Sequence, residues 1–115
     1  MEVNNHINYV EFYSPDLQIV KSFYSQVFEW VFTDFGLSYT AFSESGIAGG
    51  FELSDKPISK GALVILYHSE LENIREKIKT AGGSIVQDVF SFPGGKRFHF
   101  KDPAGNELAV WTETN

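Results

Sequence analysis

The sequence lacks cysteine altogether, and this absence removes several kinds of chemistry at once. Without a thiol the chain can form no disulfide, hold no metal through thiolate and use no cysteine nucleophile. No apolar run approaches the roughly 20 residues that a membrane-spanning helix needs, so we expect no membrane association. The first residues, Met1 to Asn5, carry no basic stretch followed by an apolar one, which predicts a cytoplasmic protein without a secretory signal.

Clustered positive charge is also missing. The chain carries nine Lys and Arg against fifteen Asp and Glu, a formal charge of −6, and its cations are scattered singly. Nucleic-acid binding needs a clustered basic surface that neutralises phosphates, so we expect no nucleic-acid partner. Aromatic residues, in contrast, make up 16% of the chain. Most should fill the core of a single domain of 115 residues, and a few could line a ligand pocket.

The predicted elements follow one order, strand, helix and three strands, which then repeats. In the first module, about residues 6–54, strand formers at 6–13 precede a helix with apolar residues at helical spacing: Leu17, Val20, Phe23, Tyr24 and Val27. Ser14 is expected to cap this helix, with Pro15 at its first position. Three strands are predicted to follow, at 30–35, 38–42 and 47–53.

The same order returns after a linker at 55–61, in a second module of about residues 62–114. The apolar run at 62–67 predicts a buried strand, Ser69 is expected to cap the second helix, and Gly82-Gly83 should end it. Strands are predicted at 84–90, 97–101 and 107–112. A helix followed by a strand meander, repeated, indicates an α+β fold with mostly antiparallel sheet.

Two local motifs give this order a family resemblance. The first is Pro15-Asp16-Leu17 followed by Phe23-Tyr24 and Val27-Phe28-Glu29-Trp30, and the second is the run from Phe98 to Leu108 with Asp102-Pro103-Ala104-Gly105-Asn106 as its turn. Joined by Ala81-Gly82-Gly83, they resemble the motifs of the vicinal-oxygen-chelate superfamily of glyoxalases, bleomycin-resistance proteins and extradiol dioxygenases. The resemblance covers about residues 6–113. Glu29 departs from it, because the family usually has glycine there.

The resemblance implies two βαβββ modules forming a curved, mostly antiparallel eight-stranded sheet around a cleft, and a homodimer. It also implies metal ligands on the first and last strand of each module. Tyr9, Leu63 and Ala109 stand at three of the four ligand positions, and none offers an imidazole or carboxylate. We therefore expect no metal cofactor. If a divalent metal is bound after all, Glu52 and His99 are the candidate donors.

Alternation of side chains along strands predicts which residues face the cleft. The expected ligand-binding residues are Tyr9, Glu11, Tyr13, Ile65, Tyr67, Arg97, His99, Glu107 and Trp111, with Leu63 beside them. His6 and His68 should point away. The polar members also have purely structural interpretations: Glu11 and Arg97 as an ion pair at the rim, His99 bonded to a backbone carbonyl, and Glu107 solvated after the turn.

These residues favour a protein that binds a small, aromatic or partly polar organic molecule without a metal, as bleomycin-resistance proteins do. Two enzymatic alternatives stay open. One is a metal-dependent lyase or dioxygenase, which would need the missing ligands. The other is a metal-free enzyme with Glu11 or His99 as general base, since both residue types can move a proton near neutral pH. A role as a subunit without a ligand is a further alternative.

Overall fold

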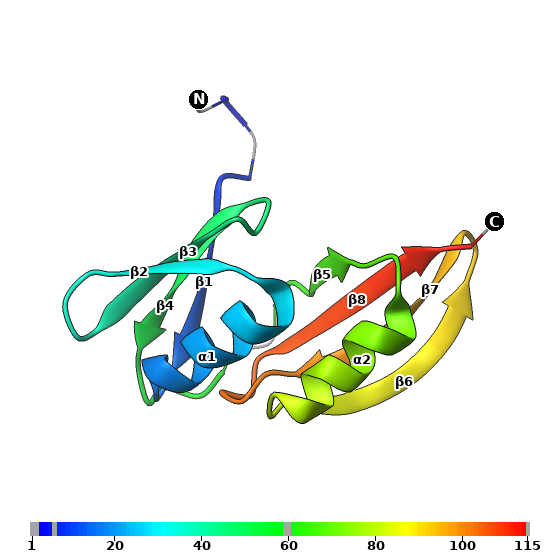
Figure 1. Cartoon of the computed structure of the whole chain (residues 1–115). Helices are drawn as coiled ribbons and strands as arrows, with labels where there is room; N and C mark the ends of the chain where they lie inside the picture. The colour runs from blue at the N-terminus through cyan, green and yellow to red at the C-terminus, as the bar shows by residue number, and fades with distance from the viewer. Residues whose placement is uncertain (1–2, 6, 59–60, 115) are drawn as a thin grey trace. The chain divides into compact units, whose positions relative to one another are not determined.

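The computed structural model describes residues 3–5, 7–58 and 61–114 of the chain. The chain divides into two compact units, Met1–Lys56 and Pro57–Asn115, and each contains a strand, a helix and three further strands in that order (Figure 1). The predicted α+β class with two βαβββ modules is therefore confirmed. The eight strands form two mixed sheets of four strands each, in which two of the three pairings are antiparallel.

The first unit packs one helix against a sheet with the order β1-β4-β3-β2. Its strands are β1 (Tyr9–Ser14), β2 (Val31–Asp34), β3 (Tyr39–Ser43) and β4 (Ala48–Leu53), and α1 spans Leu17–Phe28. Four of the five predicted apolar positions of α1 are buried: Val20, Phe23, Tyr24 and Val27. Trp30 stacks between the rings of Tyr24 and Phe42, with centroid distances of 4.6 and 4.5 Å, and is a core residue.

The second unit repeats this plan with the strand order β5-β8-β7-β6. Its elements are β5 (Val64–Tyr67), α2 (Leu71–Thr80), β6 (Ser84–Phe92), β7 (Gly95–Lys101) and β8 (Glu107–Glu113). The buried face of α2 packs on one face of the sheet, whose inward side chains are fully buried: Phe98, Phe100, Leu108 and Val110. The unit has no second helix among its described residues, so the opposite sheet face is left without a helix of this unit over it.

The start of α1 differs from the expectation. Its N-cap is Asp16, whose Oδ1 accepts the N–H groups of Gln18 and Ile19 at 3.0 and 3.3 Å. Ser14 is the last residue of β1, and its Oγ bonds both the N–H and the C=O of Asp16. Pro15 thus lies before the cap. An aspartate at this position satisfies two helix N–H groups and places negative charge at the positive end of the helix dipole.

The second helix is also capped by an unexpected residue. Ser69 was predicted as its cap, but Glu70 stands at the N-cap position and makes no side-chain capping bond. The imidazole of His68 instead accepts the N–H of Glu70 through Nδ1 at 2.9 Å. The other end agrees with the prediction, because Gly82 has a φ of +102° and the N–H of Gly83 bonds the C=O of Ile78.

The strand β5 is not buried as its apolar sequence predicted. Ile65 and Tyr67 are 44% and 49% exposed. The reason is the topology, since β5 is an edge strand and alternate residues of it face the side of the sheet that α2 does not cover. The strand β6 is two residues longer than predicted and contains two register shifts.

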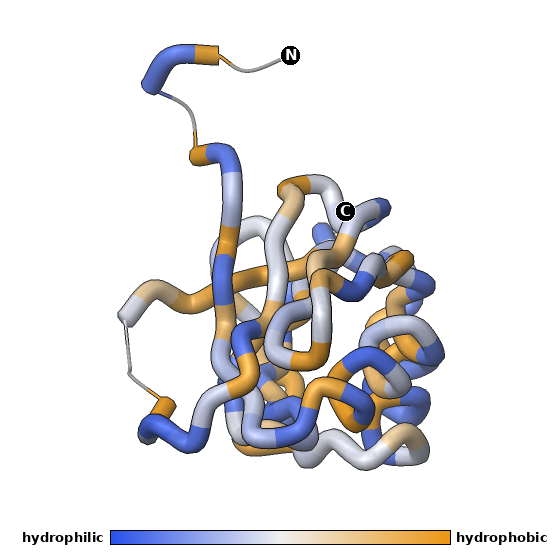
Figure 2. The backbone as a smooth tube through the Cα atoms, turned by 90° about the vertical axis from the view of Figure 1, so that its left-hand side faces the viewer, coloured by the Kyte–Doolittle hydropathy of each residue, from blue (hydrophilic) through white to orange (hydrophobic). Residues whose placement is uncertain are grey.

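Hydrophobic residues are interspersed with hydrophilic ones along the chain (Figure 2). Among the described residues no helix is long and apolar enough to cross a membrane. His6, where the first strand was predicted to begin, lies outside the described residues.

Glu29 ends α1 in the left-handed conformation, with φ of +61°, at the position where the resembling family has glycine. A side chain with a Cβ is strained there, so the Glu29→Gly variant should unfold with a free energy raised by about 0.5–1 kcal/mol. Urea unfolding measures this. The Gln26→Gly variant in the helix interior should change the free energy by a similar amount in the opposite direction. A lower midpoint for Glu29→Gly would contradict the prediction.

Candidate functional site

The face of the second unit's sheet that α2 does not cover collects most of the predicted ligand-binding residues. Strand pairing sets Arg97 opposite Trp111 and His99 opposite Ala109, while Tyr67 lies beside Trp111 and Ile65 beside Ala109. Directly paired residues share a sheet face. We call this the open face, and its members are Ile65, Tyr67, Arg97, His99, Glu107, Ala109 and Trp111.

His99 is oriented by a carboxylate on the neighbouring strand. Its Nδ1 lies 3.0 Å from Oε2 of Glu107, and its side chain is 13% exposed. A carboxylate only accepts hydrogen bonds, so Nδ1 carries the proton and a neutral imidazole keeps a lone pair on Nε2. Nε2 is buried and has no hydrogen-bond partner among the described residues. In the structural alternative for His99 its partner was a backbone carbonyl, whereas the structure gives Nδ1 the carboxylate of Glu107 as partner.

Arg97 is held between two aromatic rings. The central carbon of its guanidinium lies 5.3 Å from the ring centroid of Phe90 and 5.8 Å from that of Phe92. Such contacts stabilise a cation without consuming its N–H donors. The Nε of Arg97 is buried and, like Nε2 of His99, lacks a partner within the described part of the chain. Each unpaired buried polar group costs about 1–3 kcal/mol.

A second polar pair lies at the other end of β8. The hydroxyl of Tyr67 donates to Oε1 of Glu113, and this bond raises the pKa of Tyr67 and lowers the pKa of Glu113. The Tyr67 ring meets Trp111 edge-on at 5.3 Å. Glu113 was missed because the strand was predicted to end at residue 112; one more residue of the same alternation would have included it.

A cavity of about 390 Å³ has Glu107 among its lining residues. It lies wholly within the second unit, next to the Lys101–Glu107 pair at the start of β8. Its lining consists of Ile58, Gly61, Ala62, Leu63, Lys101, Gly105 and Glu107. Leu63 and Glu107, both expected near a cleft, thus line one hollow.

The first unit holds a separate polar cluster on its own sheet. The Tyr39 hydroxyl donates to Oε1 of Glu11 at 3.0 Å and lies 2.5 Å from the Tyr9 hydroxyl. Tyr39 was not predicted. It reaches Glu11 because Gly50 stands between them on β4, where any Cβ would come within 2.3 Å of the Tyr39 oxygen. Burial and the bonds to Tyr9 and Glu11 raise the pKa of Tyr39 above its ordinary value.

Tyr13, the third predicted residue of β1, has Lys56 over its ring at 5.8 Å and pairs with Glu52 across the sheet. The predicted site residues therefore form two groups, one in each unit. That Glu11 and His99 line a common cleft stays a prediction.

The donor atoms do not fit a metal centre. Among the described residues of the open face, His99 and Glu107 bring together one imidazole and one carboxylate, whereas Glu113 lies at the other end of β8 and is bonded to Tyr67. Leu63 and Ala109 are aliphatic, and catalytic zinc sites use three protein ligands. Glu52 has Tyr13 and Tyr39 as its strand neighbours rather than histidines. Within residues 3–5, 7–58 and 61–114 no three His, Asp or Glu side chains gather in a way that could hold a metal ion.

The family comparison matches nearly the whole chain. Residues 6–110 match the model of the Glyoxalase/Bleomycin resistance protein/Dioxygenase superfamily. No match was found among curated proteins.

Solved structures with the same fold share little sequence with this chain. A glyoxalase/bleomycin resistance protein/dioxygenase family enzyme from Burkholderia phytofirmans PsJN superposes with a TM-score of 0.81 at 14% identity, covering 93% of this chain and 98% of its own. TioX from Micromonospora sp. ML1 gives 0.73 at 15% identity, covering 96% and 100%. Lactoylglutathione lyase from Agrobacterium tumefaciens gives 0.71 at 16%, covering 96% of each chain. Identities this low show the fold alone.

The raised pKa of Tyr39 predicts a stability change at alkaline pH. Because the folded state holds this proton more tightly than the unfolded chain, stability is lost as pH rises above the ordinary tyrosine value of 10.0. The Tyr39→Phe variant should therefore lose less unfolding free energy than the unaltered protein between neutral pH and pH above 10. Urea unfolding at each pH measures the difference. Equal losses in the two proteins would refute the assignment.

Proposed function

The chain belongs to the glyoxalase/bleomycin resistance protein/dioxygenase superfamily, and we propose that it binds a small organic anion with an aromatic ring, without a metal, on the open face. One observation carries the proposal. Nε of Arg97 and Nε2 of His99 are buried on the same strand face, two residues apart, and neither has a partner in the described part of the chain. Buried polar groups are normally paired, so these two atoms favour a ligand that completes them.

The charge of the ligand follows from Arg97. A guanidinium only donates hydrogen bonds and stays protonated, so its natural partner is a carboxylate or similar anion. A hydrogen bond to a charged group contributes about 1.5–3 kcal/mol. The overall charge of −6 would favour a cation instead, but that field is spread over the surface, whereas the Arg97 contact is local and partly desolvated.

The aromatic part of the ligand follows from the neighbours of Arg97. Phe92 lies 6.4 Å from the Trp111 ring, and Trp111 in turn contacts Tyr67. Ligand sites are mostly apolar surfaces with a few placed polar groups, and this group of rings around one cation has that composition.

A metal-free enzyme is the second candidate, favoured by the His99–Glu107 pair. A carboxylate that fixes the tautomer of a histidine leaves its other nitrogen ready to accept a proton, which is the arrangement of a general base. A metal-dependent lyase or dioxygenase is disfavoured by the donor set. The lyase activity in the name of the Agrobacterium tumefaciens protein is a property of that protein, and we do not transfer it to this chain. The homodimer and the cytoplasmic location remain predictions.

Three probes that share one ring and differ in charge test the proposal: benzoate, benzylamine and benzyl alcohol. Benzoate should raise the melting temperature most, because a ligand of the folded state stabilises it. It should also shift the NMR signals of the Arg97 side-chain N–H and the His99 ring. Stronger stabilisation by benzylamine than by benzoate would overturn the proposed charge.

Paired variants locate the site. Arg97→Met should reduce benzoate affinity by roughly tenfold or more, the loss expected for a charged hydrogen bond. Lys96→Met is the matched control, because Lys96 is the neighbouring cation on β7 and is exposed. An equal loss of benzoate affinity in both variants would mean that binding depends only on the net charge of the protein. Catalysis through His99 would instead appear as turnover that His99→Gln abolishes while binding persists.

Independence from metal is tested on the purified protein. We expect substoichiometric zinc, nickel, iron and manganese, because no three His, Asp or Glu side chains of the described residues gather at one place. Elemental analysis after exhaustive dialysis measures this. One tightly bound metal ion per chain, absent from the Glu107→Gln or His99→Gln variant, would contradict the metal-free proposal.

A further inference from the structure

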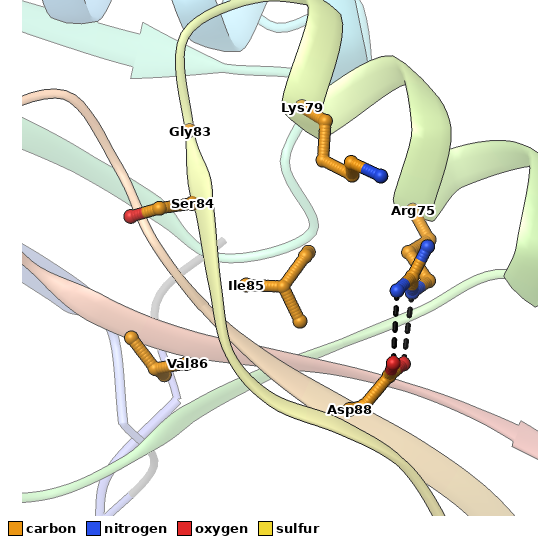
Figure 3. Close-up of a pocket in the computed structure, with 7 residues that line it drawn as sticks. All are labelled: Arg75, Lys79, Gly83, Ser84, Ile85, Val86 and Asp88. Atoms are coloured by element: carbon orange, nitrogen blue, oxygen red, sulfur yellow. Dashed lines mark hydrogen bonds and ion pairs between the residues drawn. The ribbon is translucent and has the colours of Figure 1, made fainter.

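An ion pair behind the sheet joins α2 to the edge strand β6. Nε and an Nη atom of Arg75 each lie 2.9 Å from one carboxylate oxygen of Asp88, so the two planar groups meet through two parallel bonds (Figure 3). Figure 3 shows this pair at one side of an open pocket of about 520 Å³. The other lining residues are Lys79, Gly83, Ser84, Ile85 and Val86.

The same carboxylate also fixes backbone. Oδ1 of Asp88 accepts the N–H of Val89 at 2.8 Å in addition to the bond from Arg75. Asp88 and Val89 are the two residues of β6 between Gln87 and Phe90, where β7 has only Phe98 between the paired residues. They therefore form a β-bulge, and Asp88 ties the bulge backbone to the helix.

This bulge decides the direction of Phe90. In a regular strand Asp88 and Phe90 would point to the same face, because they are two residues apart. In the structure Asp88 reaches Arg75 on the helix side, while Phe90 pairs with Arg97 on the open face. Phe90 there lies over the Arg97 guanidinium and 5.8 Å from the His99 ring.

We propose that Arg75 and Asp88 are positioning residues for the open face: their ion pair holds the β6 bulge, and the bulge holds Phe90 against Arg97 and His99. Most surface ion pairs contribute little to stability and position nothing else. Here, however, the bulge connects the ion pair to Phe90, whose ring lies near both the Arg97 guanidinium and the His99 ring. The functional part rests on the proposed ligand site, whereas the positioning part does not.

The first test therefore needs no ligand. In Asp88→Ala the ring-proton signals of His99 should move toward their positions in a Phe90→Leu reference, and the NOE between Phe90 and His99 should weaken. His99→Gln identifies the signals among the three histidines of the chain. If Asp88→Ala does not fold, Arg75→Lys is read instead, because lysine keeps the charge and loses the two-bond geometry. It should give the same shift, smaller in size.

The matched control is Glu76→Gln. Glu76 is the other ion-pair partner of Arg75, at 2.7 Å, and it lies on α2 without contacting the bulge through that bond. Its loss should leave the His99 signals in place. A second control, Asp34→Asn, removes an ion pair of similar exposure in the first unit. The proposal is overturned if the folded Asp88→Ala or Arg75→Lys variant keeps its His99 signals at their original positions.

Benzoate titration separates this inference from the proposed function. Asp88→Ala should weaken benzoate binding about two- to fivefold, the change expected from one cation–π contact, and Glu76→Gln should not. Moved His99 signals in a protein that never binds benzoate would support the positioning role and refute the ligand. If Asp88→Ala instead leaves both the benzoate affinity and the His99 signals unchanged, the ligand site is supported and the positioning role is refuted.

Discussion

The open face of the second unit depends on one turn, the connection between β7 and β8, in which Asp102 and Asn106 are buried. Oδ1 of Asp102 accepts the N–H groups of Ala104 and Asn106 at 2.9 Å, and Gly105 takes the positive φ that reverses the chain. The turn fixes the register of the two strands. A slip by one residue would exchange the two faces of a strand, turning His99 toward α2 and a core phenylalanine toward the open face. This turn therefore decides to which face of the sheet His99 points.

The register of β7 and β8 sets which side chains lie on the helix side of the sheet and which lie on the open face. The helix side of β7 and β8 is filled by large apolar side chains, and these compensate for leaving two nitrogens unpaired on the other side. Glu107 pairs with one nitrogen of His99 and leaves the other available. Ala109, the strand partner of His99, offers no metal donor, and Arg97 supplies a fixed positive charge on the same face. A guanidinium can hold an anion but cannot act as a Lewis acid, and the proposed function is therefore binding rather than metal-assisted chemistry.

The sequence was sufficient for the features that depend on local patterns. Alternation within β7 and β8 placed Arg97 and His99 on one face, because both strands are regular up to the turn. It failed where a contact depends on a distant residue. Tyr39 reaches Glu11 only because a glycine on β4 leaves room for it. Phe90 was missed for a different reason, since a bulge breaks the alternation on which the prediction relied.

The helix caps also depend on contacts that the local sequence pattern does not predict. Asp16 and Ser14 are both good caps by type, and the sequence does not decide between them. In the structure the Ser14 hydroxyl bonds the backbone of Asp16, and Asp16 caps the helix. His68 accepts a helix N–H through Nδ1, a role that its sequence position does not indicate. A histidine used in this way is occupied structurally, which leaves His99 as the histidine within the described residues whose free nitrogen is buried. Of the two histidines within the described residues, His68 thus has a structural partner, and the proposed site depends on His99.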